Sequence, residues 1–321
     1  MKIRKAFWMF SSVILTLLPG LALAQRQLVA THEDVPVLIP LSGHAPRWTN
    51  NRLAGCDHCD GAPILYTADR QGNRETVALD IPRSDLTSVR DVAAGSDGSL
   101  AAVGLAISGD SRMGTFIAWI APDRSRQVIT RVWPYSPNVV AVAPDGTIWT
   151  VGAMMNDSPR VVYPNVLRHY APLGQLLASN IVGRAWKSDG GLYEVSETSA
   201  LMASNDRIGW LTMACQYIEF SFDAVEMGRY GCPNGYSYIR QVGGSALSSA
   251  DDLLIGGKPA APLAPLELDR ATNTWKSVAV TEESSKSVEF LGFDGLTLVT
   301  RAGGPMLRRY AWSDQPSAAG H

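Results

Sequence analysis

The sequence predicts an all-β fold: a single β-propeller of six blades, each of four antiparallel strands, in a ring closed by an N-terminal strand. Hairpins recur at intervals of roughly 40 to 50 residues, which is the spacing of propeller repeats. In one family of hairpins, two apolar strands flank a short turn of Asp, Asn or Gly, residue types that accept the backbone angles of tight turns. This family spans residues 92–104, 139–152, 200–213, 245–255 and 288–300.

A second, more polar family of hairpins lies between members of the first. It spans residues 64–79, 117–132, 166–181, 217–230 and 265–280, with a final half at 306–312. Two hairpins per repeat make four strands, which is the unit of a propeller blade. First-family strands such as 139–143 are apolar at nearly every position, as expected for inner strands covered on both faces. The second family therefore supplies the outer half of each blade.

The two ends of the repeat array are less regular. The last blade lacks a fourth strand, because a short flexible tail, 313–321, follows it, and we expect the apolar stretch 37–41 to fill that edge. The inner pair of the first blade should lie in 42–63, although proline, asparagine, glycine and cysteine interrupt the strand pattern there. The connection 182–198 is either an insertion or a degenerate hairpin. Seven blades are the alternative to six.

Residues 1–24 are typical of a secretory signal peptide. Lys2, Arg4 and Lys5 precede an apolar run that Pro19 breaks, and Ala22 and Ala24 fit the small-residue rule for cleavage after Ala24. An uncleaved anchor is the alternative. We therefore expect one domain, 25–321, in the periplasm or secreted, with no stable insertion into a membrane after cleavage.

The charge of residues 25–321 argues against nucleic acid as a partner. The whole chain has 28 basic and 30 acidic residues, and the signal holds three of the basic ones, which leaves 25 against 30 and a net charge of −5. Neither a basic run nor a basic excess is present to bind phosphates. We expect no nucleic acid partner.

Four cysteines in an oxidising compartment predict two disulfides. The pairs nearest in sequence are Cys56 with Cys59 and Cys215 with Cys232, although four cysteines allow three pairings. Cys215 and Cys232 bracket one outer hairpin, so a staple across it is expected. For Cys56 and Cys59 a metal site and disulfide exchange are the alternatives to a structural bridge.

The blade repeats resemble those of NHL-like and SMP-30-like six-bladed propellers. Residues 142–149, VAPDGTIW, combine an apolar strand, an Asp-Gly turn and an aromatic strand in the way those families do. The resemblance covers most of residues 90–312 and implies the fold. SMP-30-like lactonases hold a metal at the mouth of the central channel, but none of their ligand-bearing motifs matches a stretch of this sequence.

The candidate ligand-binding residues lie where the chain begins each inner strand, at one mouth of the predicted channel. They are Arg90, Asn138, Glu197, Arg240 and Lys286. These side chains suit a polar or anionic ligand. Trp48 or Trp186 would line a surface groove, whereas tryptophans in the repeated strands pack between blades. No catalytic or metal-ligating residue is predicted, because neither a nucleophile elbow nor a matched metal-ligand set is present.

The leading functional hypothesis is an exported propeller that serves as a binding or interaction module for a protein, peptide or glycan. We expect no cofactor and no enzymatic activity. The alternative is a metal-dependent hydrolase or lactonase at the channel mouth, using calcium or another divalent metal held by one residue from each of several blades.

Overall fold

The computed structural model of the chain describes residues 25–31, 34–37, 46–109, 113–156, 161–182, 199–236, 244–256, 265–280, 288–302 and 306–315. Over these residues the secondary structure consists of strands and turns, without a helix. Within the same ranges, no helix is long and apolar enough to cross a membrane. The predicted signal, 1–24, lies outside the described residues.

The strands follow one another in antiparallel units of four, which we name by their first strands. The β3 unit comprises β3 (Arg47–Thr49), β4 (Arg52–Asp57), β6 (Ile64–Ala68) and β7 (Arg74–Ala78). The β8 unit comprises β8 (Leu86–Ala94), β9 (Leu100–Ile107), β10 (Met113–Ile120) and β11 (Gln127–Arg131). A short strand, β5 (Asp60–Gly61), pairs with β8.

The next units repeat this pattern. The β12 unit comprises β12 (Tyr135–Val142), β13 (Ile148–Met155), β14 (Val161–Tyr170) and β15 (Leu176–Ile181). The β16 unit comprises β16 (Ala200–Ala203), β17 (Ile208–Leu211), β18 (Tyr217–Phe220) and β19 (Glu226–Tyr230). The β20 unit comprises β20 (Ser245–Leu247), β21 (Leu253–Ile255), β22 (Leu266–Asp269) and β23 (Thr274–Ser277), and β24 (Ala279–Val280) follows it.

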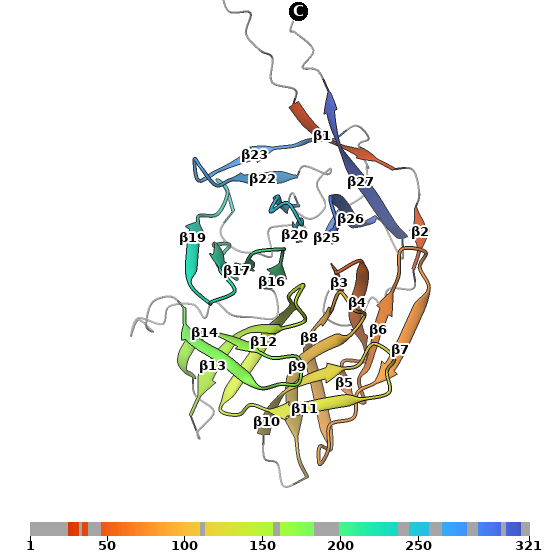
Figure 1. Cartoon of the computed structure of the whole chain (residues 1–321), viewed down its shortest axis with the longest axis vertical. Helices are drawn as coiled ribbons and strands as arrows, with labels where there is room; N and C mark the ends of the chain where they lie inside the picture. The colour runs from red at the N-terminus through yellow and green to blue at the C-terminus, as the bar shows by residue number, and fades with distance from the viewer. Residues whose placement is uncertain are drawn as a thin grey trace, which may run out of the picture.

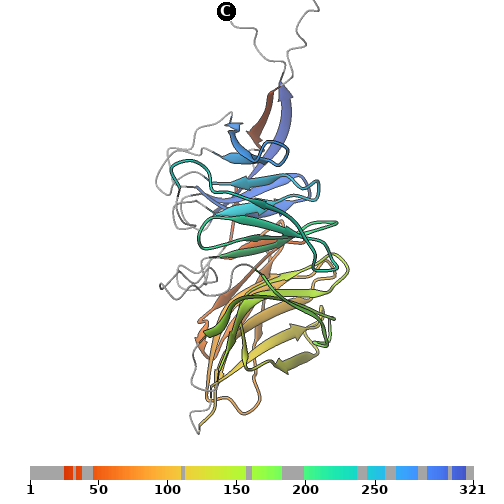
Figure 2. The ribbon, with the colours of Figure 1, turned by 90° about the vertical axis from the view of Figure 1, so that its left-hand side faces the viewer.

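The β25 unit takes its fourth strand from the other end of the chain. β25 (Val288–Asp294), β26 (Thr297–Ala302) and β27 (Met306–Gln315) pair in order, and β1 (Gln25–Ala30) then pairs antiparallel with the outer edge of β27. A two-residue strand, β2 (Val35–Pro36), continues along the same edge. In Figures 1 and 2, β1 and β27 lie together and extend beyond the other strands at one end.

Two expectations about these regions were wrong, and a third was confirmed. The strand that pairs with β27 is β1, not 37–41, of which only Val37 is described. The predicted tail begins too early, because β27 continues to Gln315. The stretch 42–63 contains β3 and β4, the inner pair expected there, joined by a two-residue turn in which Asn50 and Asn51 have positive φ angles of 49° and 66°. Asparagine accepts these angles, so the residues that obscured the strand pattern form the hairpin.

The units lie side by side around a common centre, with their first strands innermost (Figure 1), which is the arrangement of a β-propeller. Apolar clusters fill the space between neighbours: one joins the β3 and β8 units through residues such as Leu65 and Val89, and another joins the β25 and β3 units through Leu291 and Trp48. All eight residues of β12 are buried, as the apolar runs predict for inner strands. Each large apolar side chain so buried contributes about 1.5 to 3 kcal/mol.

The Asp-Gly turns have the predicted geometry. Gly98, Gly146 and Gly295 have φ angles of 88°, 82° and 62°, which residues with a Cβ rarely adopt. In the second of these turns, Asp145 accepts a 2.9 Å hydrogen bond from the backbone N–H of Thr147. The turns therefore hold the first two strands of their units in register.

Candidate functional site

One ion pair ties the inner strands of four units together near the centre. Arg47, on β3, donates through Nη2 to the carboxylate of Asp91 on β8 and through Nη1 to the backbone oxygen of Leu201 on β16, at 2.9 Å. Asp91 Oδ2 also accepts the N–H of Val140 on β12, at 2.7 Å, and Oδ1 accepts the N–H of Val92, at 2.9 Å. The Arg47 side chain thus spans the space between inner strands that are far apart in sequence.

This pair is shielded from solvent and its hydrogen-bonding capacity is largely used. The side chain of Arg47 is 16% exposed and that of Asp91 is 6% exposed. A carboxylate with a guanidinium and two backbone N–H groups on its oxygens has little capacity left for a ligand. The Arg47–Asp91 pair is therefore neutral overall and leaves few groups with which a ligand could pair.

The turn between β3 and β4 covers part of the centre from one side. Asn50 donates through Nδ2 to the backbone oxygens of Ala94, at 2.7 Å, and Val142, at 3.2 Å. Thr49 Oγ1 accepts the N–H of Ala94, at 3.0 Å. These bonds fix the β3–β4 turn over the ends of β8 and β12.

A small recess, partly open to solvent, lies beside this turn. Most of its lining is apolar or backbone, and its polar side chains are few. The lining residues are Arg47, Trp48, Thr49, Asn50, Ala141, Val142, Met202, Ala203, Ser245, Ala246, Leu247, Leu291, Gly292 and Phe293. We call this space the axial recess, because every lining residue belongs to an inner strand or to the β3–β4 turn. Apolar walls with a few convergent polar groups are the usual composition of a small-molecule site.

Two of the predicted binding residues meet each other. Arg90 Nη1 donates to Asn138 Oδ1, to Ser136 Oγ at 2.9 Å and to the backbone oxygen of Pro137 at 3.2 Å. Arg90 is half-buried and Asn138 is 9% exposed. These bonds join the β8 and β12 strands.

The other three predicted binding residues, Glu197, Arg240 and Lys286, lie outside the described residues. Arg90 and Asn138 lie in the middle of β8 and β12, not at the strand beginnings where they were expected, and neither lines the axial recess. Trp48 is 2% exposed and lines this recess, so its expected place on an exposed surface groove was wrong; Trp186 is not described.

Sequence reasoning missed Arg47, Asp91 and Asn50. Arg47 and Asp91 come from different repeats, and nothing local marks either as a partner of the other. Asn50 did carry a signal, because two consecutive asparagines are a hairpin turn sequence. That signal predicts the turn, and only the assembled units place it over the recess.

Cys215 and Cys232 lie at disulfide distance, with Cα atoms 5.1 Å apart. Cys215 follows β17, where its φ of 64° closes a turn, and Cys232 follows β19. The pair lies in the apolar cluster between the β16 and β20 units. The predicted staple across this outer hairpin has the geometry it needs.

Cys56 and Cys59 differ from the expectation, because neither forms a disulfide here and both are buried. Cys59 Sγ lies 3.3 Å from the backbone oxygen of Cys56. A hydrogen bond with Cys59 and burial raise the pKa of the Cys56 thiol far above its usual range. Because the thiolate is the reactive and metal-binding form, this environment disfavours both disulfide exchange and metal capture by Cys56.

A second buried charge lies between the β16 and β20 units. Glu219 is 1% exposed and accepts hydrogen bonds from Arg270, at 2.7 and 2.9 Å, and from Arg207, at 3.1 Å. Burial and the negative charge of Glu219 raise the pKa of Tyr217 well above its usual value. The charged groups of this network pair with one another. We therefore assign the network to the packing of the two units.

The described part of the chain holds no group of three or more His, Cys, Asp or Glu side chains that could bind a metal. His169 lies within β14. It stacks on Trp149 with ring centroids 4.0 Å apart, and burial lowers its pKa. The two rings are cross-strand neighbours, so the stack lies within the β12 unit.

No protein-family model and no curated protein matches the chain. Among solved structures it is similar to the Dos1 propeller, with 10% identity and a TM-score of 0.43 over 81% of this chain. It spans 64% of that chain, which is less than two thirds of its length.

Two further structures are similar. The Cps50 (Swd1) beta-propeller domain of Myceliophteria thermophila has 7% identity and a TM-score of 0.46 over 87% of this chain and 99% of that one. BBS1N, solved in complex with ARL6DN, has 13% identity and a TM-score of 0.47 over 87% and 80% of the two chains. The resemblance to NHL-like and SMP-30-like propellers stays a prediction.

Proposed function

We propose that the chain is an exported, six-bladed β-propeller that acts as a binding module and takes its ligand in the axial recess. The six blades are the units headed by β3, β8, β12, β16, β20 and β25, with β1 as the outer strand of the last. Closure of the ring is supported by the pairing of Gly292 with Trp48 and by the apolar cluster between the β25 and β3 units. Export is supported by the signal-like residues 1–24 and by the Cys215–Cys232 pair.

The observation that carries the binding function is the composition of the axial recess. Its one charged lining residue, Arg47, is already neutralised by Asp91, so the recess has no net charge to attract an ion. Asn50 and Ser245 add polar side chains to a wall made mostly of apolar side chains and backbone. Such a wall fits an uncharged, partly apolar group, which we take to be part of a peptide or a glycan.

The alternative hydrolase has less support at this site. A metal at the recess needs free oxygen ligands, whereas the Asp91 carboxylate accepts from Arg47 and two backbone N–H groups. Binding a cation there would break the ion pair that joins the inner strands. A binding module therefore fits the recess better than a metal-dependent enzyme does.

The test narrows the recess with a bulky side chain in its wall. Ala203 is half-buried in the recess wall, so Ala203→Trp should occupy the space, whereas Thr76→Trp changes an exposed position on the outer strand β7. Fluorescently labelled residues 25–321 would be applied to peptide and glycan arrays, and the best probe titrated against all three proteins.

We expect saturable binding that Ala203→Trp weakens at least about tenfold, or about 1.4 kcal/mol, and Thr76→Trp leaves unchanged. Unaltered affinity in Ala203→Trp would exclude the recess as the binding site. Failure of the wild-type protein to bind either array would count against a peptide or glycan ligand.

A further inference from the structure

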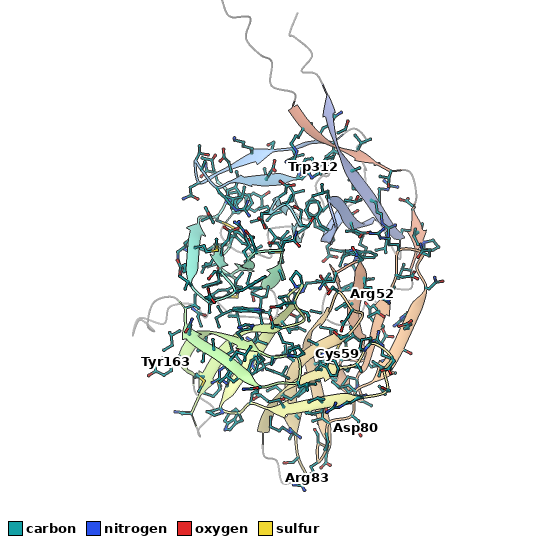
Figure 3. The ribbon with its side chains drawn as sticks, viewed as in Figure 1. Arg52, Cys59, Asp80, Arg83, Tyr163 and Trp312 are labelled. Atoms are coloured by element: carbon teal, nitrogen blue, oxygen red, sulfur yellow. A yellow bond between two sulfur atoms is a disulfide. The ribbon has the colours of Figure 1, made fainter. Side chains whose placement is uncertain are left out.

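Two polar side chains that line the axial recess have hydrogen-bonding groups to spare. Asn50 uses its Nδ2 for two backbone oxygens, so its Oδ1 lies on the opposite side of the amide and has no partner among the described residues. The Ser245 hydroxyl likewise makes no hydrogen bond within that part of the chain. In Figure 3, Arg52, directly after the turn that carries Asn50, lies nearer the centre of the ring than Tyr163 at the outer margin. The recess therefore offers one acceptor and one hydroxyl donor near the centre.

The space inside the recess is too small for a ring. Its volume is about 50 Å³, a third of the roughly 150 Å³ that a cavity needs to hold benzene. Its larger apolar lining residues include Val142, Met202, Leu247 and Phe293, each at most 8% exposed. A methyl group with a few neighbouring atoms fits such a space, whereas a sugar ring or an aromatic side chain must stay outside it.

These features together fit a secondary amide that ends in a methyl group. Its N–H can donate to Asn50 Oδ1, its oxygen can accept from the Ser245 hydroxyl, and its methyl group can contact the apolar lining. An ion fits less well, because Arg47 already pairs with Asp91. Arg47 also spans the space between the inner strands, so we expect the recess to end at that side chain. A closed recess admits the end of a group and excludes an amide in the middle of a chain.

The turns next to the recess suit a ligand rich in hydroxyl groups. Asn50 bonds to the ends of β8 and β12, which lead into the turns that carry Asp97 and Asp145. Both carboxylates are exposed, and each uses Oδ1 for a backbone N–H of its own turn, of Ser99 at 2.8 Å and of Thr147 at 2.9 Å. Within the described ranges, Oδ2 of neither has a partner. A carboxylate oxygen accepts hydrogen bonds from hydroxyl groups.

We propose, building on the binding function proposed above, that the axial recess takes the acetamido group of an N-acetylated amino sugar. The methyl group enters the recess, the N–H donates to Asn50 and the C=O accepts from Ser245, while the sugar ring stays outside, beside the neighbouring turns. In a glycan the acetamido group branches from the ring, so any N-acetylated sugar along the chain can present it. In a peptide of unmodified side chains only an acetylated N-terminus can, which makes the glycan the better occupant.

Saturation-transfer NMR on residues 25–321 with N-acetylglucosamine tests this recognition. We expect a dissociation constant on the order of 1 mM, because a ligand of this size has few atoms with which to contact the protein. The methyl protons should receive more saturation than the ring protons, because only the methyl group is enclosed.

Ligand analogues and two serine variants test the contacts one by one. Glucosamine, which lacks the acetyl group, should not bind, and N-butanoylglucosamine, whose acyl chain is longer, should bind at least about tenfold more weakly, the equivalent of about 1.4 kcal/mol. Ser245→Ala should weaken binding of N-acetylglucosamine at least about threefold through loss of one hydrogen bond. Ser249→Ala, at an exposed serine of the same unit outside the recess, is the matched control and should bind like the wild type.

The outcomes separate this inference from the binding function on which it rests. Equal affinity for the acetyl and butanoyl sugars, unaltered affinity in Ser245→Ala, or tighter binding of Nα-acetylalanine amide than of N-acetylglucosamine would each overturn the acetamido sugar as ligand. If N-acetylglucosamine does not bind but an array probe still binds in a way that Ala203→Trp weakens, the inference is wrong and the binding function stands. A protein that binds neither would contradict both.

Discussion

Removing Arg47 tests whether its ion pair with Asp91 holds the centre of the fold together. Arg47→Ala deletes the guanidinium that contacts the Asp91 carboxylate and the backbone oxygen of Leu201. Asp91, whose side chain is 6% exposed, is then left as a buried charge without its cation. The substitution therefore affects contacts among four units while shortening one side chain.

The expected magnitude follows from what remains around Asp91. Breaking a buried ion pair by removing one partner costs about 3 to 5 kcal/mol. The N–H groups of Val92 and Val140 still donate to the carboxylate, at 2.9 and 2.7 Å, so we expect the low end, about 3 kcal/mol. In a double-mutant cycle with Asp91→Ala, the coupling free energy should be about 2 kcal/mol.

Urea unfolding followed by tryptophan fluorescence measures these free energies. Lys276→Ala is the control: it removes a lysine that is 64% exposed and pairs with Asp269 at the surface, so it should cost at most about 1 kcal/mol. A coupling below about 0.5 kcal/mol, or a cost for Arg47→Ala no greater than that for Lys276→Ala, would refute the role assigned to the pair.

Three further predictions concern the staple, a close contact and pH. Replacing Cys215 and Cys232 with serine opens a loop with a sequence separation of 17 and should lower the unfolding free energy by about 3 kcal/mol, measured in urea. Gly292→Ala should lower the melting temperature by several degrees, because its Cβ would lie 2.0 Å from a backbone oxygen, whereas Gly231→Ala, with open space around it, should not. Burial lowers the pKa of His169, so its stabilising neutral form is present above the unfolded-state pKa of about 6.5 and lost as pH falls toward the folded-state value. His169→Gln should therefore flatten the loss of melting temperature between pH 7.5 and 5, and an unchanged pH profile would contradict this.

The hairpins were predictable because their chemistry is local. An Asp-Gly turn such as 145–146 determines the backbone angles of its own strands, and the apolar run of β12 indicates burial on both faces without reference to any partner. The staple was predictable for the same reason, since Cys215 and Cys232 bracket one hairpin.

The closing strand was not predictable from apolar content. The stretch 37–41 is more apolar than β1, but β1 buries Leu28 and Ala30 alternately, with the less buried Val29 between them, as an edge strand does. Its pairing depends on β27, at the far end of the chain.

The residues around the axial recess were not predictable for the same reason, because their contacts depend on distant parts of the chain. Arg47 and Asp91 belong to different units, and in the sequence neither differs from any other charged residue within a strand. The residues chosen from strand beginnings, Arg90 and Asn138, do meet, but neither lines the recess. The outcome for the other three candidates is undecided, because they lie outside the described residues.

The pairing of β1 with β27 also sets the order in which the fold can be completed. Every other unit is built from strands that follow one another closely, so each can form soon after its residues are synthesised. β1 is made first and must wait for β27, and until they meet the ten residues of β27 present an open edge. Deleting β1 should therefore produce a protein that resembles this late intermediate. We expect that protein to be prone to aggregation, even though every other unit is intact.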